Sequence, residues 1–254
     1  MTNGTRSVPT RRRAILAIAP ASVVLMAGVA IFVMSRRTDG GAGAVADGAA
    51  APGGIDWETT SEGDFESRLA DTSGSRIVLR AATRGTAADT VKFLGVRRRK
   101  EIRLTPGARI AVDLDWNRQA NGSGLSAGLV LSPEATQGNP LANASAFWVE
   151  FIGVPPGRNA RRVIGLRSDS QSRTLDKEGW PEENREGREI GVQRIEIGEK
   201  KEIRVLENGV PVYSSAPDAL GFDRGYLYLQ ISSRANYPPR EVAFVPISVR
   251  SGGR

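Results

Sequence analysis

Residues 201–215 read KEIRVLENGVPVYSS, two short runs rich in apolar residues that are joined by Asn208 and Gly209. An Asn-Gly pair fits the two-residue type I′ turn of a β-hairpin, because both positions of that turn need positive φ. The runs 201–207 and 210–215 are therefore predicted to be antiparallel strands. The chain on either side is also divided into short runs separated by turn residues, which indicates an all-β fold.

Ten further runs are alternating or apolar over strand length and carry no helical stripe. These runs are 76–82, 90–96, 101–104, 108–116, 125–132, 146–154, 161–168, 191–198, 225–233 and 241–250. So many short strands at close spacing predict an antiparallel β-sandwich that occupies residues 55–254. Residues 64–71 are the one stretch of this region for which we expect a short helical turn.

Two of these runs indicate which side chains are buried. From residue 110 to residue 116 every second residue is a large apolar one, so Asp113 and Asp115 are expected on the opposite, polar face. The run 241–250 is apolar on both faces, which is typical of a strand covered on both sides. Pro246 within it indicates an edge or a bulge, because proline cannot donate a ladder hydrogen bond.

Residues 14–34 contain no charged side chain over 21 positions. A helix of this length is about 30 Å long, which matches the hydrocarbon core of a bilayer. Arginine residues flank the segment at Arg11, Arg12 and Arg13 on one side and at Arg36 and Arg37 on the other. The larger positive charge before the segment predicts a single-pass protein with its N-terminus in the cytoplasm and its C-terminal region outside. A cleaved signal peptide is the alternative, but its apolar region would be shorter.

The chain is accordingly predicted to have four parts. These are a cytoplasmic basic N-terminus (1–13), a transmembrane helix (14–34), a flexible Gly/Ala-rich linker (35–54) and an extracytoplasmic domain, in the periplasm or at the cell surface (55–254). Six arginines and no acid lie in residues 1–37, so the remaining chain holds 29 basic and 28 acidic residues out of totals of 35 and 28. A domain with so little net charge is not expected to bind nucleic acid.

The chain has no cysteine and no histidine. This excludes disulfides, zinc thiolate sites, cysteine nucleophiles and every triad that depends on histidine. We therefore assign no catalytic residue and no metal ligand, expect no resident cofactor, and lean against an enzyme. Arginine greatly outnumbers lysine, which is typical of a GC-rich, bacterial genome.

The C-terminal order of hairpin, Gly-led strand and closing strand resembles a known family. It is similar to the concanavalin A-like lectin/glucanase jelly rolls, particularly the bacterial 3-keto-disaccharide hydrolase-like and laminin G-like domains. The matching residues are Asn208, Gly209, Gly225, Leu229, Gln230, Phe244 and Ile247. The resemblance implies a jelly-roll fold over residues 57–250. The resemblance does not imply catalysis. The glucanases carry paired acids on one strand, and the nearest run here has Asp113 and Asp115 but lacks the flanking glutamates.

Four residues are candidates for ligand binding. Asp113 and Asp115 lie on one strand face and, with Asn117, offer oxygen ligands for calcium or carboxylates for sugar chemistry. The alternative is that the aspartates lie on a solvated sheet face and pair with arginines. This alternative is favoured because these residues supply fewer oxygen ligands than calcium sites usually have. Trp180 lies in a highly charged stretch and is a candidate for stacking on a sugar, the alternative being a loop anchor.

Three functions remain open. The leading hypothesis is a membrane-anchored, extracytoplasmic binding module for a glycan or an envelope protein. The second is a carboxylate-dependent glycoside hydrolase-like enzyme that uses Asp113, Asp115 or Glu150. The third is a structural single-pass subunit of a membrane protein assembly, whose helix packs on others.

Overall fold

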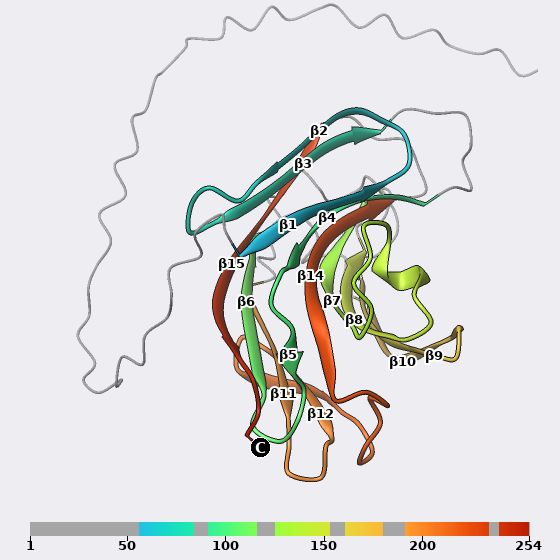
Figure 1. The fold of residues 1–254 in the computed structure, drawn as a ribbon, viewed down its shortest axis with the longest axis vertical. Helices are drawn as coiled ribbons and strands as arrows, with labels where there is room; N and C mark the ends of the chain where they lie inside the picture. Colours follow the sequence, from blue (N-terminus) through green and yellow to red (C-terminus); the bar gives the residue numbers. More distant parts are fainter. Residues whose placement is uncertain are drawn as a thin grey trace, which may run out of the picture. The chain divides into compact units, whose positions relative to one another are not determined.

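A computed structural model describes residues 56–83, 91–115, 125–152, 161–179, 191–233 and 239–253. These residues form two antiparallel β-sheets with almost no helix (Figure 1). The predicted all-β sandwich is confirmed. Among the described residues, no helix is both long and apolar enough to span a bilayer. The segment 14–34 and its flanking arginines lie outside the described residues, so the predicted anchor stays a prediction.

The first sheet has β14 near its centre and pairs strands that are distant in sequence. Its order is β1 (Trp57–Glu62), β4 (Lys92–Arg98), β14 (Arg224–Ser233), β7 (Ser126–Ser132), β8 (Ala146–Ile152), β9 (Arg161–Ser168) and β10 (Gln171–Gly179). A short strand, β5 (Ile102–Arg103), pairs with the beginning of β14. A single 3-10 turn at Pro140–Ala142 lies in the described connection between β7 and β8.

The second sheet has β6 and β15 in its interior. Its order is β13 (Val210–Ser214), β12 (Ile203–Glu207), β11 (Gly191–Ile197), β6 (Arg109–Asp115), β15 (Arg240–Arg250), β3 (Ile77–Thr83) and β2 (Phe65–Asp71). The predicted turn joins β12 to β13, with φ of 51° at Asn208 and 83° at Gly209. β15 has a register shift between Pro246 and Ser248, so the predicted bulge is confirmed.

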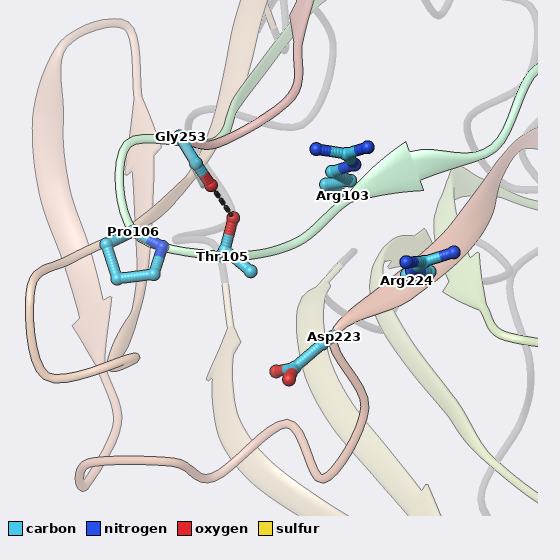
Figure 2. A pocket seen from close by; sticks show the side chains of 6 residues that line it. All are labelled: Arg103, Thr105, Pro106, Asp223, Arg224 and Gly253. Atoms are coloured by element: carbon cyan, nitrogen blue, oxygen red, sulfur yellow. Dashed lines mark hydrogen bonds between the residues drawn. The ribbon is translucent and has the colours of Figure 1, made fainter.

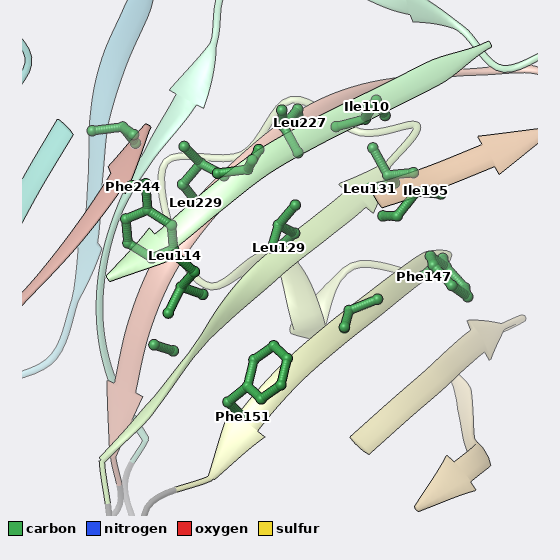
Figure 3. Packing of buried hydrophobic residues seen from close by; sticks show 14 of the residues in the cluster. Ile110, Leu114, Leu129, Leu131, Phe147, Phe151, Ile195, Leu227, Leu229 and Phe244 are labelled. Atoms are coloured by element: carbon green, nitrogen blue, oxygen red, sulfur yellow. The ribbon is translucent and has the colours of Figure 1, made fainter. Parts of the chain in front are cut away.

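The core lies between the two sheets and takes alternate side chains from both. Figure 3 shows Leu129, Phe147 and Phe151 of the first sheet packed with Ile110 and Phe244 of the second. All five are at most 1% exposed. Burial of this apolar surface is the main favourable contribution to folding.

All twelve predicted strands are present, and three strands were not predicted. β1 and β10 are the edges of the first sheet, and β2 is an edge of the second. The helical turn expected at 64–71 is wrong, because Phe65–Asp71 pairs with β3 instead. Edge strands pair on one side and bury fewer side chains, so their sequences lack the apolar alternation on which the prediction depended.

Candidate functional site

The outer face of the first sheet, which points away from the core, carries a second apolar cluster. Alternation along β7, β8 and β14 sends Val130, Trp148 and Tyr228 to this side, opposite the core residues. Strand register aligns one row of side chains across this face. The row is Glu58, Arg97, Tyr228, Val130, Trp148 and Gly165. Side chains in such a row are direct neighbours, so this face forms one continuous surface.

The connection between β7 and β8 (residues 133–145) crosses part of this face and is held by Tyr228. The Tyr228 hydroxyl donates to the Glu134 carbonyl at 2.7 Å and accepts from the Thr136 N–H at 2.9 Å. The side chain is fully buried, and burial raises the pKa of its phenol. A neutral phenol is what this geometry needs, because the group must both donate and accept.

Two glutamates of β1 hold the far end of the same connection. The Gln137 side chain donates to Glu58 at 2.5 Å, and the Asn139 N–H donates to Glu62 at 2.9 Å. The Ser61 N–H also donates to the Gln137 carbonyl at 2.9 Å. The connection therefore passes over β14, β4 and β1 and closes that half of the face.

Arg97 links this closed half to the sheet beneath it. Its guanidinium donates to Glu58 at 2.5 Å and lies 5.0 Å from the centre of the Tyr226 ring. The side chain is only 11% exposed. Hydrogen bonding from Gln137, and then from Arg97, lowers the pKa of Glu58. Glu58 is thus held as a carboxylate at neutral pH.

The other half of the face, over β7, β8 and β9, remains open around Trp148. A Cβ placed at Gly165 would lie 2.1 Å from Cζ2 and 2.3 Å from Cε2 of the Trp148 indole, so the ring lies across the glycine. Trp148 is only partly buried. The ring therefore lies over Gly165, and part of the Trp148 side chain stays exposed on the open side.

Polar groups lie beside this aromatic surface. Glu150, two residues along β8 from Trp148, is partly exposed and accepts a hydrogen bond from the Ser232 hydroxyl at 3.3 Å. Ser126 of β7 is paired in register with both Ser232 and Ile152. On the outer face of the described parts of β7 to β10, Glu150 is the one side chain that carries a carboxylate.

The predicted site residues do not gather on this face. Asp113 and Asp115 lie on β6, on the outer side of the second sheet, while Ile110 and Leu114 of that strand enter the core. Asp115 is paired with Arg76 at 2.7 Å, and both side chains are about half exposed. This arrangement supports the alternative interpretation of a solvated face paired to arginine. Asn117 and Trp180 lie outside the described residues.

Calcium was the metal considered from the sequence, with the side-chain oxygens of Asp113, Asp115 and Asn117 as its possible ligands. Within the described ranges no three acidic side chains stand close enough together to hold a metal ion. The Arg76 guanidinium beside Asp115 already supplies a positive charge at that carboxylate. Calcium binding by this cluster therefore has no support from the residues that the structure describes, and Asn117, which is outside them, is untested.

The alternation of residues 147–151 is the sequence signal that could have identified the site around Trp148. Phe147, Val149 and Phe151 enter the core, so Trp148 and Glu150 must share the opposite face. Nothing in the sequence indicated that Gly165 would lie beneath the indole, because that contact depends on the register of β8 with β9.

Comparisons with known proteins found similar solved structures. No family model matches the chain, and no curated protein matches it. A legume lectin-like domain from Entamoeba histolytica is similar in structure, with a TM-score of 0.48 and 10% identity over 78% of this chain and 91% of that one. A putative β-glucanase from Mycobacterium abscessus also has a TM-score of 0.48, with 13% identity over 77% of this chain and 92% of the other.

A third similar structure is the exoplasmic/lumenal domain of VIP36 in a Ca²⁺/Man-bound form. It has a TM-score of 0.45 and 9% identity, and the match covers 79% of this chain and 89% of that one. The similar structures thus include legume lectin-like and glucanase domains, all with TM-scores below 0.5. The likeness concerns the fold alone.

Proposed function

We propose that residues 55–254 form an extracytoplasmic binding module for a glycan, held at a membrane by residues 14–34. The observation that carries the glycan assignment is the Trp148 ring lying across Gly165 beside Glu150. One face of a sugar ring is lined by C–H groups and packs on an aromatic surface, while its hydroxyls need polar partners at the rim. The indole supplies the first requirement, and the Glu150 and Ser232 oxygens supply the second.

The same surface argues against hydrolysis as the first choice. Glycoside hydrolases use two carboxyl groups roughly 5–9.5 Å apart, one as acid and one as base or nucleophile. In the described parts of β7 to β10, Glu150 has no second carboxylate beside it on this face, and Asp113 and Asp115 lie on the other sheet. A single carboxylate is sufficient to accept hydrogen bonds from sugar hydroxyls.

Titration calorimetry with neutral and acidic oligosaccharides tests the glycan assignment, using the full chain in mild detergent. Trp148→Ala and Glu150→Gln are expected to weaken binding about tenfold or more, because each removes a principal contact. Asp115→Asn is the matched control for Glu150→Gln, since it makes an acid-to-amide change on the opposite sheet. Full binding by Trp148→Ala would contradict the proposal. Release of reducing sugar that depends on Glu150 would replace it with the hydrolase alternative.

The placement at a membrane has its own test. The 21 uncharged residues at 14–34 and the excess of arginine before them support an uncleaved anchor with residues 38–254 outside. We expect the intact mass for the purified protein, retention in the membrane fraction after an alkaline wash, and degradation of the C-terminal region by protease added to spheroplasts. A mature N-terminus near residue 47 would overturn the anchor.

A protein partner remains the second candidate for the ligand. The described outer face of the first sheet is partly apolar at Trp148 and Ile152, which also suits a side chain of a neighbouring envelope protein or a larger membrane assembly. Recovery of a stoichiometric partner that is lost with Trp148→Ala, together with no binding of any oligosaccharide, would favour that function.

A further inference from the structure

Two arginines lie directly opposite each other where the short strand β5 pairs with the start of β14. Arg103 of β5 is the register partner of Arg224 at the start of β14. The next pair in the same ladder is Ile102 with Gly225, and Ile102 is fully buried in the core. Because neighbouring residues alternate between faces, Arg103 and Arg224 both project to the outer side of the sheet. Their Cβ atoms are therefore expected about 5 Å apart.

The arginines line a pocket of roughly 450 Å³. Its other lining residues are Thr105, Pro106, Asp223 and Gly253 (Figure 2). The Thr105 hydroxyl donates to the Gly253 carbonyl at 2.9 Å, and the Gly252 N–H donates to the Arg103 carbonyl at 3.0 Å. These bonds fix the last described residues of the chain as one wall of the pocket.

Within the described part of the chain, the positive charge of the pair is only partly balanced. Asp223, the acid in the pocket wall, is engaged by the Lys201 ammonium at 3.1 Å. Arg224 approaches Glu101 only at 3.8 Å, and the Arg103 guanidinium has no ion-pair partner among the described residues. Like charges directly opposite each other in a sheet destabilise it, so an anion between them would stabilise the pair.

We propose that this arginine pocket binds the oxyanion substituent of an acidic saccharide, a carboxylate or a sulfate. Each guanidinium presents two parallel N–H donors that match the two oxygens of such a group. The pocket is large enough for one sugar ring carrying the charge. The identity of the ligand as a saccharide rests on the proposed glycan function, whereas the anion preference rests on the two arginines.

Calorimetry of the full chain in mild detergent tests this pocket with three probes. These are an oligogalacturonate, a sulfated oligosaccharide and a neutral glucan oligosaccharide of the same length. The two acidic probes separate a carboxylate from a sulfate preference. We expect at least one of them to bind about tenfold or more tightly than the neutral probe. The double variant R103Q/R224Q is expected to remove that preference, and raising the salt concentration is expected to weaken it.

Arg76→Gln is the matched control for each single variant, because Arg76 is an exposed arginine just before β3 of the second sheet and its loss removes one positive charge. The single variants R103Q and R224Q keep the test valid if the double variant misfolds. Each is expected to lose part of the preference for the acidic probes. Equal binding of acidic and neutral probes, or a preference unchanged in R103Q/R224Q, would overturn the inference. Neutral binding that depends on Trp148 would then still support the proposed function. An acidic preference lost in R103Q/R224Q but untouched by Trp148→Ala would support this pocket and contradict the aromatic site.

Discussion

The indole of Trp148 occupies the space that a side chain at Gly165 would fill. A Cβ at position 165 would come within 2.1 Å of the ring, far inside van der Waals contact. The two residues are register partners on β8 and β9, so the lack of a side chain on one strand determines the orientation of the ring on the other. Sequence alternation places Trp148 on the outer face, and the absence of a side chain at Gly165 leaves room for the ring there.

Gly165→Ala is expected to displace the ring and to lower the free energy of unfolding by about 1–3 kcal/mol, as for other overpacked sites. Saccharide binding is expected to fall as it does for Trp148→Ala. Near-ultraviolet circular dichroism, urea denaturation and calorimetry measure the three effects. Gly74→Ala is the control, because a Cβ at that position has its nearest neighbour at 3.9 Å. A Gly165→Ala variant with unchanged tryptophan signals would disprove the stacking arrangement.

Tyr228→Phe is expected to release the β7–β8 connection from β14. The change removes the acceptor of the Thr136 N–H and the donor to the Glu134 carbonyl in one step. Leaving such a donor unsatisfied costs about 1–3 kcal/mol, which urea denaturation measures. Tyr226→Phe is the control, since no hydrogen bond of its hydroxyl occurs among the described residues, and it should change stability by about 0.5 kcal/mol or less. Equal effects of the two substitutions would show that the hydroxyl of Tyr228 does not hold the connection.

Glu58 makes the stability of the domain depend on acid pH. Its pKa in the folded state lies below the ordinary value near 4.3, because Gln137 and Arg97 donate hydrogen bonds to the carboxylate. A lowered pKa contributes stability that is fully present above the unfolded-state value and is lost as the pH falls through the folded-state value. The stability difference between the wild type and Glu58→Gln should thus be constant from pH 6 to 8 and shrink below about pH 4. Urea denaturation of both proteins across this range measures it, and a difference independent of pH would contradict the assignment.

Arg162 and Glu207 form an ion pair that joins the two sheets through the interior. The guanidinium donates to the Glu207 carboxylate at 2.7 Å, and each side chain is 4% exposed. The Arg162 guanidinium also lies 3.3 Å from the Asp176 carboxylate, so Glu207→Gln removes one of its charge partners and is expected to cost about 1–3 kcal/mol. The paired change Arg162→Met with Glu207→Leu should recover much of the loss in thermal denaturation.

The control for this pair is Asp115→Asn, which breaks an exposed ion pair with Arg76. Exposed pairs contribute about 0–1 kcal/mol, so its effect on unfolding should be small. If Glu207→Gln cost no more than Asp115→Asn, the interior pair would have no special role in joining the sheets.

The strands inside the sheets were predictable because their signals are local. The Asn208-Gly209 turn depends only on backbone preferences at two positions, and alternation along residues 110–114 marks a half-buried strand wherever it pairs. The edge strands β1, β2 and β10 were missed because their own sequences carry no such local signal. A polar strand such as QSRTLDKEG (171–179) is stabilised by hydrogen bonds to its neighbour, which its own sequence does not specify.

The site was only partly predictable. Trp148 and Glu150 share a face by alternation alone, but the predicted pair Asp113 and Asp115 lies on the other sheet beside Arg76. The pairing of β14 with β4 and β7 joins residues about 100–130 positions apart and sets the row through Trp148. The pairing of β14 with β5 sets the opposition of Arg103 to Arg224.

The amino-acid sequence alone predicted an all-β fold for residues 55–254 and predicted which side chains alternate toward a core, because turn geometry and the two-residue strand period are properties of neighbouring residues. Tertiary structure alone decided which strands are adjacent, and therefore that Gly165 lies under Trp148, that Tyr228 holds the β7–β8 connection, and that two arginines face each other. These relationships depend on hydrogen-bond register between distant segments, which is selected by the packing of the whole sandwich and not by any local pattern.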